Sequence, residues 1–264
     1  MRKLLERAKL HTVCESAKCP NLCDCWQRRT ATFMILGNNC SRNCKFCAVE
    51  HGRPEPVDPA EPGHVAEAVN ALKLRYAVIT CVTRDDLPDG GAAHMAATVN
   101  AIRSRNPETK VEVLCSDYQE QHSAIDCVLA AGPVVFGHNL ETVARLTPLI
   151  RSHADYQRSL RVLRYAAEQA PTGTLVKSGL MLGLGETAAE IRQALADLRA
   201  ADVRMVTMGQ YLQPSKDNWP VARIITPDEF KQWADIAEND FGFQKAVCGP
   251  LVRSSYLAEE AYNG

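Results

Sequence analysis

The sequence predicts an α/β fold built around a parallel sheet. Short apolar runs rich in β-branched residues alternate with longer amphipathic stretches, and about six such pairs follow one another from Thr30 onward. Repeated βα units require parallel strands, because each helix carries the chain back to the edge where the next strand begins. The pattern fits an open doubly wound sheet or a barrel. In either fold we expect active residues at the carboxyl ends of the strands.

The first three βα units are predicted between residues 31 and 132. Strands are expected at 31–37, 76–82 and 110–115, where the residues are apolar and rich in β-branched side chains. Helices are expected at 62–74, 92–104 and 121–132. The first of these has Val65, Ala68, Val69 and Leu72 at helical spacing, and Gly132 is a stop signal for the third.

The remaining units are predicted between residues 133 and 240. Strands are expected at 133–139, 174–182 and 203–212. Helices are expected from about Leu140 to Ile150, from Asp155 to Gln169, and at 187–200 and 227–240. The last of these begins with Pro227 and acidic residues, which favour a helix start.

Composition narrows the class of protein. The chain has 264 residues and a net charge of −1, so it can form a core without disulfides and has no basic run suited to nucleic acid or an anionic membrane. It has no apolar stretch near the roughly 20 residues of a membrane span, and its start lacks the apolar core of a signal peptide. We therefore expect a cytoplasmic protein with reduced thiols, in which clustered cysteines hold metal more often than they form disulfides.

One group of cysteines follows the first predicted strand as Cys40-x3-Cys44-x2-Cys47. Three thiolates this close can bind one soft metal centre, whereas a structural zinc ion usually takes four ligands. Three cysteines with no obvious fourth favour an iron–sulfur cluster that keeps one iron open to a ligand. A zinc knuckle or a chance grouping is the alternative.

A second group lies upstream as Cys14-x4-Cys19-x5-Cys25, with Cys23 inside it. This spacing is less diagnostic, and a zinc site with Cys23 or His11 as the fourth ligand is possible. We favour a second iron–sulfur cluster, held by three cysteines and a distant fourth ligand.

These motifs resemble a known family. The segment "CSRNCKFC", with Phe46 as its aromatic residue, resembles the signature of the radical SAM superfamily. The upstream triad resembles that of the lipoyl synthase family, as do "ATFMILG", "VITCVTRDDLPDGGA", "HNLETV", "KSGLMLGLGET", "GQYLQPS" and "RSSY". The blocks occur in the family's order, from about His11 to Tyr256.

The resemblance implies a partial (β/α)6 barrel of the radical SAM type. The barrel would span residues 30–240. A cysteine-rich extension at 1–29 would carry an auxiliary cluster, and a C-terminal segment at 241–264 with the RSSY motif would complete that cluster's site.

The resemblance also implies two 4Fe–4S clusters and S-adenosylmethionine as cofactors. Cys40, Cys44 and Cys47 would hold the cluster that binds S-adenosylmethionine, from which a 5′-deoxyadenosyl radical is made. The auxiliary cluster would be the sulfur donor, with Cys14, Cys19, Cys25 and Ser255 as ligands and catalytic residues; Ser254 is the second choice for the serine.

The implied reaction inserts sulfur at C6 and C8 of an octanoyl group carried by a lysine. The partners would be octanoylated carrier domains, either the glycine-cleavage H protein or acyltransferase lipoyl domains. A ferredoxin or flavodoxin would supply electrons, and an iron–sulfur carrier would repair the donor cluster.

Further residues are candidates for binding S-adenosylmethionine on the same grounds. A polar turn, a strand-to-helix turn or a structural charge partner is the alternative for most of them. The candidates are Phe46, Arg84, Asp85, Asn139, Lys177, Gly179, Gly183 and Glu186.

The chain departs from the family at Gly137, Asn218, Trp219 and Cys23, and we expect none of these to touch a ligand residue. Three rival functions stay open. They are another two-cluster radical SAM enzyme such as a different sulfur inserter, a non-enzymatic iron–sulfur electron carrier, and a zinc-stabilised binding module.

Overall fold

The computed structural model describes residues 5, 10–16, 19, 21–28, 30–256 and 258–263. The chain divides into two compact units. The first comprises Met1–Arg42, Ala48–Phe136 and Pro171–Thr174, and the second comprises Asn43–Cys47, Gly137–Ala170 and Leu175–Gly264. Each unit is an α/β assembly, which confirms the predicted fold class.

Strands of the first unit form a sheet in chain order. They are β1 (His11–Thr12), β2 (Ala31–Ile35), β3 (Tyr76–Cys81) and β4 (Lys110–Leu114). β2, β3 and β4 are parallel, while β1 pairs antiparallel to β2. Every residue of β2 is buried, as expected for a parallel strand covered on both faces. The three strands predicted here are therefore confirmed.

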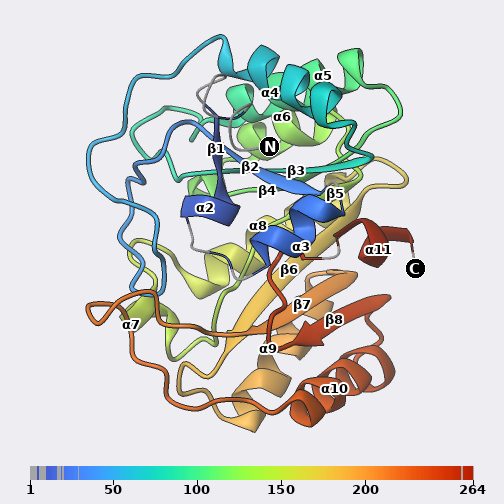
Figure 1. Ribbon diagram of the computed structural model, residues 1–264. Helices are drawn as coiled ribbons and strands as arrows, with labels where there is room; N and C mark the ends of the chain where they lie inside the picture. The colour runs from blue at the N-terminus through green and yellow to red at the C-terminus, as the bar shows by residue number, and fades with distance from the viewer. Residues whose placement is uncertain are drawn as a thin grey trace. The chain divides into compact units, whose positions relative to one another are not determined.

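Helices α4 (Glu61–Leu72), α5 (Ala92–Arg105) and α6 (His122–Ala130) pack side by side in this unit (Figure 1). Their apolar stripes face the sheet, with Val65, Val99 and Ile125 fully buried. The described part of the cysteine-rich extension at 1–29 contains β1 and two short helices, α2 (Val13–Ser16) and α3 (Leu22–Gln27).

Strands of the second unit are also parallel. β6 (Leu175–Leu182) pairs with β7 (Met205–Gln210), and β7 pairs with β8 (Lys245–Gly249). β5 (Val135–Gly137) crosses the boundary between the units. β8 lies in the C-terminal segment at 241–264, where no strand was predicted, and only one of its five residues is buried.

Helices of the second unit are α7 (Thr147–Ile150), α8 (Tyr156–Gln169), α9 (Ala188–Ala200), α10 (Pro227–Asp235) and α11 (Ala258–Asn263), and a π-helical turn, η2 (Ile236–Asp240), extends α10. Asp155 and Thr187 cap α8 and α9 through their side chains. The helix expected from Leu140 to Ile150 is wrong except at its end, because Glu141 takes a left-handed φ of 64° and bridges to Leu180 of β6.

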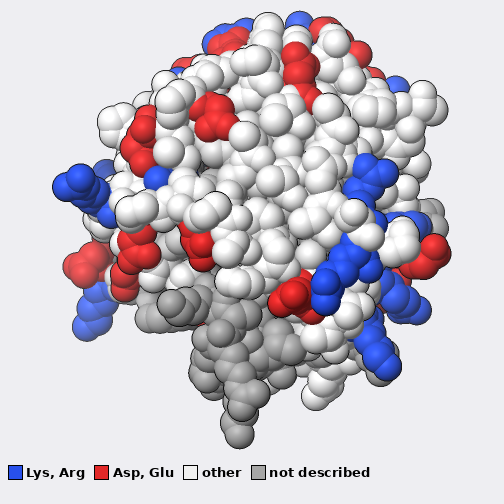
Figure 2. All heavy atoms as spheres, turned by 90° about the horizontal axis from the view of Figure 1, so that it is seen from above, with Lys and Arg blue, Asp and Glu red and all other residues white. Residues whose placement is uncertain are grey.

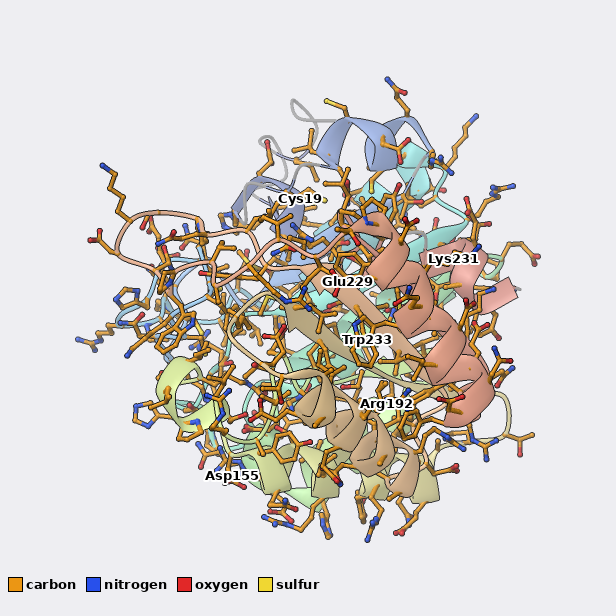
Figure 3. All side chains as sticks on the ribbon, turned by 90° about the horizontal axis from the view of Figure 1, so that it is seen from below. Cys19, Asp155, Arg192, Glu229, Lys231 and Trp233 are labelled. Carbon is orange, nitrogen blue, oxygen red and sulfur yellow. The ribbon has the colours of Figure 1, made fainter. Side chains whose placement is uncertain are left out.

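The helix α10 has a buried face and an exposed face. Trp233 points inward and is buried, while Lys231 is exposed on the other side (Figure 3). On the face seen in Figure 2, acidic and basic side chains occur in small separate groups, and other residues fill most of the area. No helix in the described part of the chain is both long and apolar enough to cross a membrane.

Candidate active site

The loop that carries the downstream cysteines begins in the first unit. Cys40 forms an isolated parallel bridge with His51, and its N–H donates to the carbonyl of Glu50 at 2.8 Å. Ser41 is held by the carbonyl of Thr83, to which both its N–H and its hydroxyl donate. The first cysteine is thus fixed to backbone on both sides.

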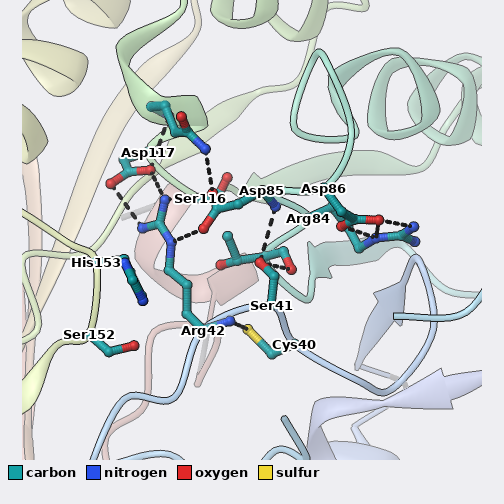
Figure 4. A network of polar contacts seen from close by, with 12 residues as sticks. Cys40, Ser41, Arg42, Arg84, Asp85, Asp86, Ser116, Asp117, Ser152 and His153 are labelled. Carbon is teal, nitrogen blue, oxygen red and sulfur yellow. Dashed lines mark hydrogen bonds and ion pairs between the residues drawn. The ribbon is translucent and has the colours of Figure 1, made fainter. Parts of the chain in front are cut away.

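Arg42, the next residue, is buried between two carboxylates (Figure 4). Its guanidinium donates to both oxygens of Asp85, at 2.7 and 2.8 Å, and to both oxygens of Asp117, at 3.0 and 2.7 Å. Burial lowers the pKa of Arg42, but the hydrogen bonds to Asp85 and Asp117 outweigh this and raise it above its usual value. Arg42 is therefore a permanent cation inside the first unit.

The second part of the loop, from Asn43 to Cys47, belongs to the second unit. Asn218 donates from its amide to the carbonyls of Lys45 and Cys47, at 3.1 and 3.0 Å. The N–H of Trp219 donates to the carbonyl of Lys45, whose ammonium lies 5.7 Å from the indole centroid. The expectation that Asn218 touches no ligand residue is thus wrong, since it binds the backbone of Cys47.

The upstream cysteines are brought together in the first unit. Cys19 donates its backbone N–H to the carbonyl of Cys14. Cys25 lies in α3, and its N–H donates to the carbonyl of Asn21. The pKa of the Cys25 thiol is raised to about 11. Burial is the main cause, and the neighbouring sulfurs of Cys14 and Cys19 also contribute. Cys23, by contrast, is exposed.

In the described residues, no three cysteine, histidine, aspartate or glutamate side chains form a group that could hold a metal ion. One chemical feature still fits a cluster. The sulfurs of Cys14 and Cys19 disfavour the thiolate form of Cys25, and a bound metal centre would offset this repulsion. The ligand sets of both triads remain predictions.

The end of β2 is shaped by buried charged groups. Leu36 takes a left-handed φ of 68°, unusual for a branched side chain. Its N–H donates to Glu61 at 2.9 Å, and its carbonyl accepts from Arg84 at 3.2 Å. His94 lies 2.7 Å from the same oxygen of Glu61, and Arg84 also pairs with Asp86. This arrangement directs the chain out of the sheet toward Cys40.

These contacts bear on two of the cofactor candidates. Arg84 binds Leu36 and Asp86, while Asp85 binds Arg42 and accepts from Gln119 at 3.1 Å. Both therefore have structural partners in the first unit. Their role in binding S-adenosylmethionine stays a prediction.

Asn139 follows β5 in the second unit and is buried. Its amide nitrogen donates to Ser254 Oγ at 2.6 Å and to Glu141 Oε1 at 3.1 Å, which fixes the orientation of the amide. Its Oδ1 is buried and has no hydrogen-bond partner in the described chain. A Cβ on Gly179 of β6 would lie 2.9 Å from this oxygen and 2.8 Å from Thr207 Oγ1. Glycine is required at position 179 because the Asn139 amide and the Thr207 hydroxyl lie against this part of β6. The unpartnered Oδ1 of Asn139 can accept from an N–H donor.

The turn after β6 contains two more candidates. Gly183 has a φ of +96°, and its N–H donates to Glu186 Oε1 at 2.6 Å. The N–H of Leu184 donates to the other oxygen of Glu186 at 2.9 Å. Glu186 therefore closes the strand-to-helix turn. Lys177 lies on β6 and is only 1% exposed.

The C-terminal serines follow β8. Ser254 and Ser255 lie in one turn and are both half-buried, and the hydroxyl of Ser254 accepts from Asn139. Just before them, the carbonyl of Val252 passes so close to Gly209 of β7 that a Cβ there would collide with it. Arg253 donates back to the carbonyl of Val252 at 2.7 Å. Phe46, in the loop of the cysteines, is half-buried.

Comparison with known proteins identifies the family. A match to the radical SAM superfamily covers residues 34–198. The chain is 51% identical over 258 residues to the lipoyl synthase of Caldicellulosiruptor saccharolyticus, covering 98% of this chain and 90% of that protein. It is 54% identical over 266 residues to the lipoyl synthase of Pyrobaculum calidifontis, covering 99% and 90%. The chain belongs to the lipoyl synthase family.

Solved structures agree on the fold of this lipoyl synthase family member. The FeFe-hydrogenase maturase HydG from Carboxydothermus hydrogenoformans matches with a TM-score of 0.68 over 88% of this chain and 56% of that chain, at 13% identity. Methylornithine synthase matches with a TM-score of 0.61 over 81% and 63%, at 14% identity. The radical SAM fold predicted from the sequence is confirmed.

Membership in the lipoyl synthase family makes the protein an enzyme of the radical SAM superfamily. It overturns two of the rival functions, the non-enzymatic electron carrier and the zinc-stabilised binding module. The family's chemistry requires a 4Fe–4S cluster and S-adenosylmethionine. Sequence reasoning missed Glu61, Asp117 and the role of Arg42, although the position of Arg42 between two cysteines was a usable signal.

Proposed function

We propose that the protein inserts two sulfur atoms, at C6 and C8, into an octanoyl group attached to a lysine of a carrier domain. In this reaction, one C–H bond at C6 and one at C8 of the octanoyl group are each replaced by a C–S bond. One observation supports the proposal: this member of the lipoyl synthase family carries a second cysteine triad, Cys14, Cys19 and Cys25, in one short segment upstream of the signature cysteines. A second cysteine triad is what a dedicated sulfur donor would need.

Cys40, Cys44 and Cys47 are the proposed ligands of the cluster that binds S-adenosylmethionine. When bound, these groups supply a 5′-deoxyadenosyl radical that removes hydrogen from an unactivated carbon. The chain's own contribution is positioning. Asn139 Oδ1, which is buried and has no hydrogen-bond partner in the described chain, is the proposed acceptor for an N–H donor of the cofactor.

Cys14, Cys19, Cys25 and Ser255 are the proposed ligands of the donor cluster. Ser255 is the first choice for the serine of the RSSY motif, and Ser254, whose hydroxyl accepts from Asn139, is the second. An alkoxide is a harder ligand than thiolate and suits iron–sulfur chemistry less well. The serine corner is therefore where we expect the donor cluster to open when its sulfur is used.

The proposed substrates are octanoylated carrier domains, either the glycine-cleavage H protein or acyltransferase lipoyl domains. The proposed reductant is a ferredoxin or flavodoxin, and an iron–sulfur carrier would restore the donor cluster after turnover. Identity of about half over nearly the whole chain to proteins named lipoyl synthase favours this reaction over a different sulfur inserter.

The test is anaerobic incubation of the reconstituted protein with an octanoyl-lysyl peptide, S-adenosylmethionine and a reductant, followed by mass spectrometry. The expected product gains two sulfur atoms, and loses two hydrogens once the dithiol closes to a disulfide. Cys19→Ala should still cleave S-adenosylmethionine but yield no sulfur product. The exposed Cys23→Ala is the matched control and should behave as wild type. A normal sulfur yield from Cys19→Ala would contradict the proposal.

A further inference from the structure

Arg42 makes more contacts than a spacer residue between two cysteines needs. It is 6% exposed and Asp117 is fully buried, so this cation and carboxylate are both removed from water. Removing charges from water is costly, and a buried ion pair is often no better for stability than apolar packing. Stability alone therefore does not explain why a buried guanidinium with two carboxylates stands here.

The backbone of Arg42 touches the sulfur of a predicted ligand. Its N–H donates to Cys40 Sγ at 3.4 Å (Figure 4). The neighbouring residue is fixed as well, since the hydroxyl of Ser41 donates to Thr83 and accepts from the N–H of Asp85. The guanidinium and the backbone of Arg42 thus join Cys40 to the loops after β3 and β4.

The loop after β4, which supplies Asp117 and Gln119, has a strained backbone. Tyr118, Gln119 and Glu120 all have left-handed φ, at 45°, 49° and 64°. Each such residue costs on the order of 1–3 kcal/mol and persists only where the surroundings hold it. Asp117 accepts from the N–H of Gln119 at 3.1 Å, and the side chain of Gln119 donates to Asp85. The strained turn therefore brings two side chains to the site of Arg42.

We propose that Arg42, held by Asp85 and Asp117, is a positioning residue that fixes the Cys40 sulfur and donates an N–H to it. The proposal deepens the proposed function, on which it rests by taking Cys40 as a cluster ligand. Groups that orient metal ligands commonly change metal retention by about 10–100-fold when they are altered. Hydrogen bonds to ligand sulfur also set the reduction potential of iron–sulfur clusters.

The first test uses the full chain without metal. Amide hydrogen exchange at residues 40–42 should be at least about tenfold faster in Arg42→Lys than in wild type, because lysine keeps the charge but not the paired geometry. Arg192→Lys is the matched control, since Arg192 forms an exposed ion pair with Asp240 at 3.1 Å. Its exchange at 40–42 should equal that of wild type.

The second test uses the reconstituted full chain with Cys14, Cys19 and Cys25 replaced by alanine, so that only the downstream cluster is counted. Iron loss to a chelator should be about 10–100-fold faster with Arg42→Lys. The cluster's midpoint potential should fall, because a donor to sulfur stabilises the reduced state. Asp85→Asn leaves the pair between Arg42 and Asp117 intact and replaces Arg42→Lys if that variant does not fold. It should give smaller changes in the same direction.

Each outcome decides a separate point. If the triple-alanine chain with Arg42 intact binds no four-iron cluster, the assignment of Cys40, Cys44 and Cys47 fails, and with it both proposals. If that chain binds the cluster, but iron loss is unchanged in Arg42→Lys and in Asp85→Asn, the positioning role is overturned and the proposed function stands. Unchanged exchange at residues 40–42 also overturns the positioning role.

Discussion

The two halves of the loop from Cys40 to Cys47 are held by different kinds of interaction. In the first half, Arg42 is fixed by four hydrogen bonds to two carboxylates and is buried. In the second half, the neutral amide of Asn218 and the N–H of Trp219 bind backbone carbonyls. Buried charges have strict geometry and are costly to unpair, whereas amide contacts adapt and are cheap to lose.

This difference predicts which half of the loop tolerates substitution. The first half supplies one predicted ligand, and its neighbours allow little movement. The second half supplies two predicted ligands, Cys44 and Cys47, on backbone held by neutral groups. We therefore expect the halves to differ in sensitivity to substitution and to pH.

The largest expected effect comes from a ligand in the second half. Cys44→Ala should abolish formation of 5′-deoxyadenosine, because two thiolates hold a cluster poorly. Anaerobic assay by liquid chromatography measures it, with Cys23→Ala as the control. Unchanged 5′-deoxyadenosine formation would refute the assignment of Cys44 as a cluster ligand.

A smaller effect is expected from a carboxylate in the first half. Asp117→Asn should lower the free energy of unfolding of the metal-free chain by about 3–5 kcal/mol, because it removes one charge partner of the buried Arg42. Urea denaturation measures this. Asp240→Asn, which breaks an exposed pair with Arg192, should cost at most about 1 kcal/mol. Equal losses would erase the distinction between the halves.

The amide in the second half should matter less. Asn218→Ala removes two hydrogen bonds to carbonyls from a half-buried residue, and we expect a loss of about 1–2 kcal/mol. The loss should be the same at low and high salt, since no charge is involved. A loss as large as that of Asp117→Asn would mean that the second half is held as rigidly as the first.

The halves should also respond differently to acid. Burial raises the pKa of Asp85, but hydrogen bonds from Arg42 and Gln119 outweigh it and leave the pKa below its usual 3.8. A carboxylate with a lowered folded pKa stabilises the fold above its unfolded pKa, and that contribution is lost as pH falls through the folded value. The stability difference between wild type and Asp85→Asn should therefore shrink below about pH 4. The difference for Asn218→Ala should stay constant over the same range.

The smallest effect is expected at Lys45. Its ammonium lies over Trp219 but is exposed, so Lys45→Met should cost no more than about 0.5–1 kcal/mol. Thermal unfolding would detect it. A larger loss would place a second charged contact in the half that we describe as neutral.

Much of the fold could be predicted from the sequence because apolar periodicity is a local signal. It located β2, β3, β4, β6 and β7 and the helices packed beside them. It failed at Glu141, whose left-handed backbone bridges to β6, and at β8, in which only one of five residues is buried. Backbone geometry of that kind depends on partners far along the chain.

The site divides in the same way. Cysteine spacing marked the candidate ligands, since ligands of one cluster lie close in sequence. The residues that hold them do not: Asp85 and Asp117 are 43 and 75 positions from Arg42. Composition cannot show that Asp85 faces an arginine or that Asn218 faces the backbone of Cys47. Such pairings become visible only when the fold brings the strand ends together.

The close approach of Val252 to Gly209 has a consequence for the end of the chain. Attachment of the serine-bearing tail depends on a side chain that is missing from β7, not on one that the tail supplies. A single methyl group at position 209 would push the tail outward while leaving every residue of the RSSY motif unchanged. Loss of the tail's function could thus arise from a substitution in β7, outside the RSSY motif.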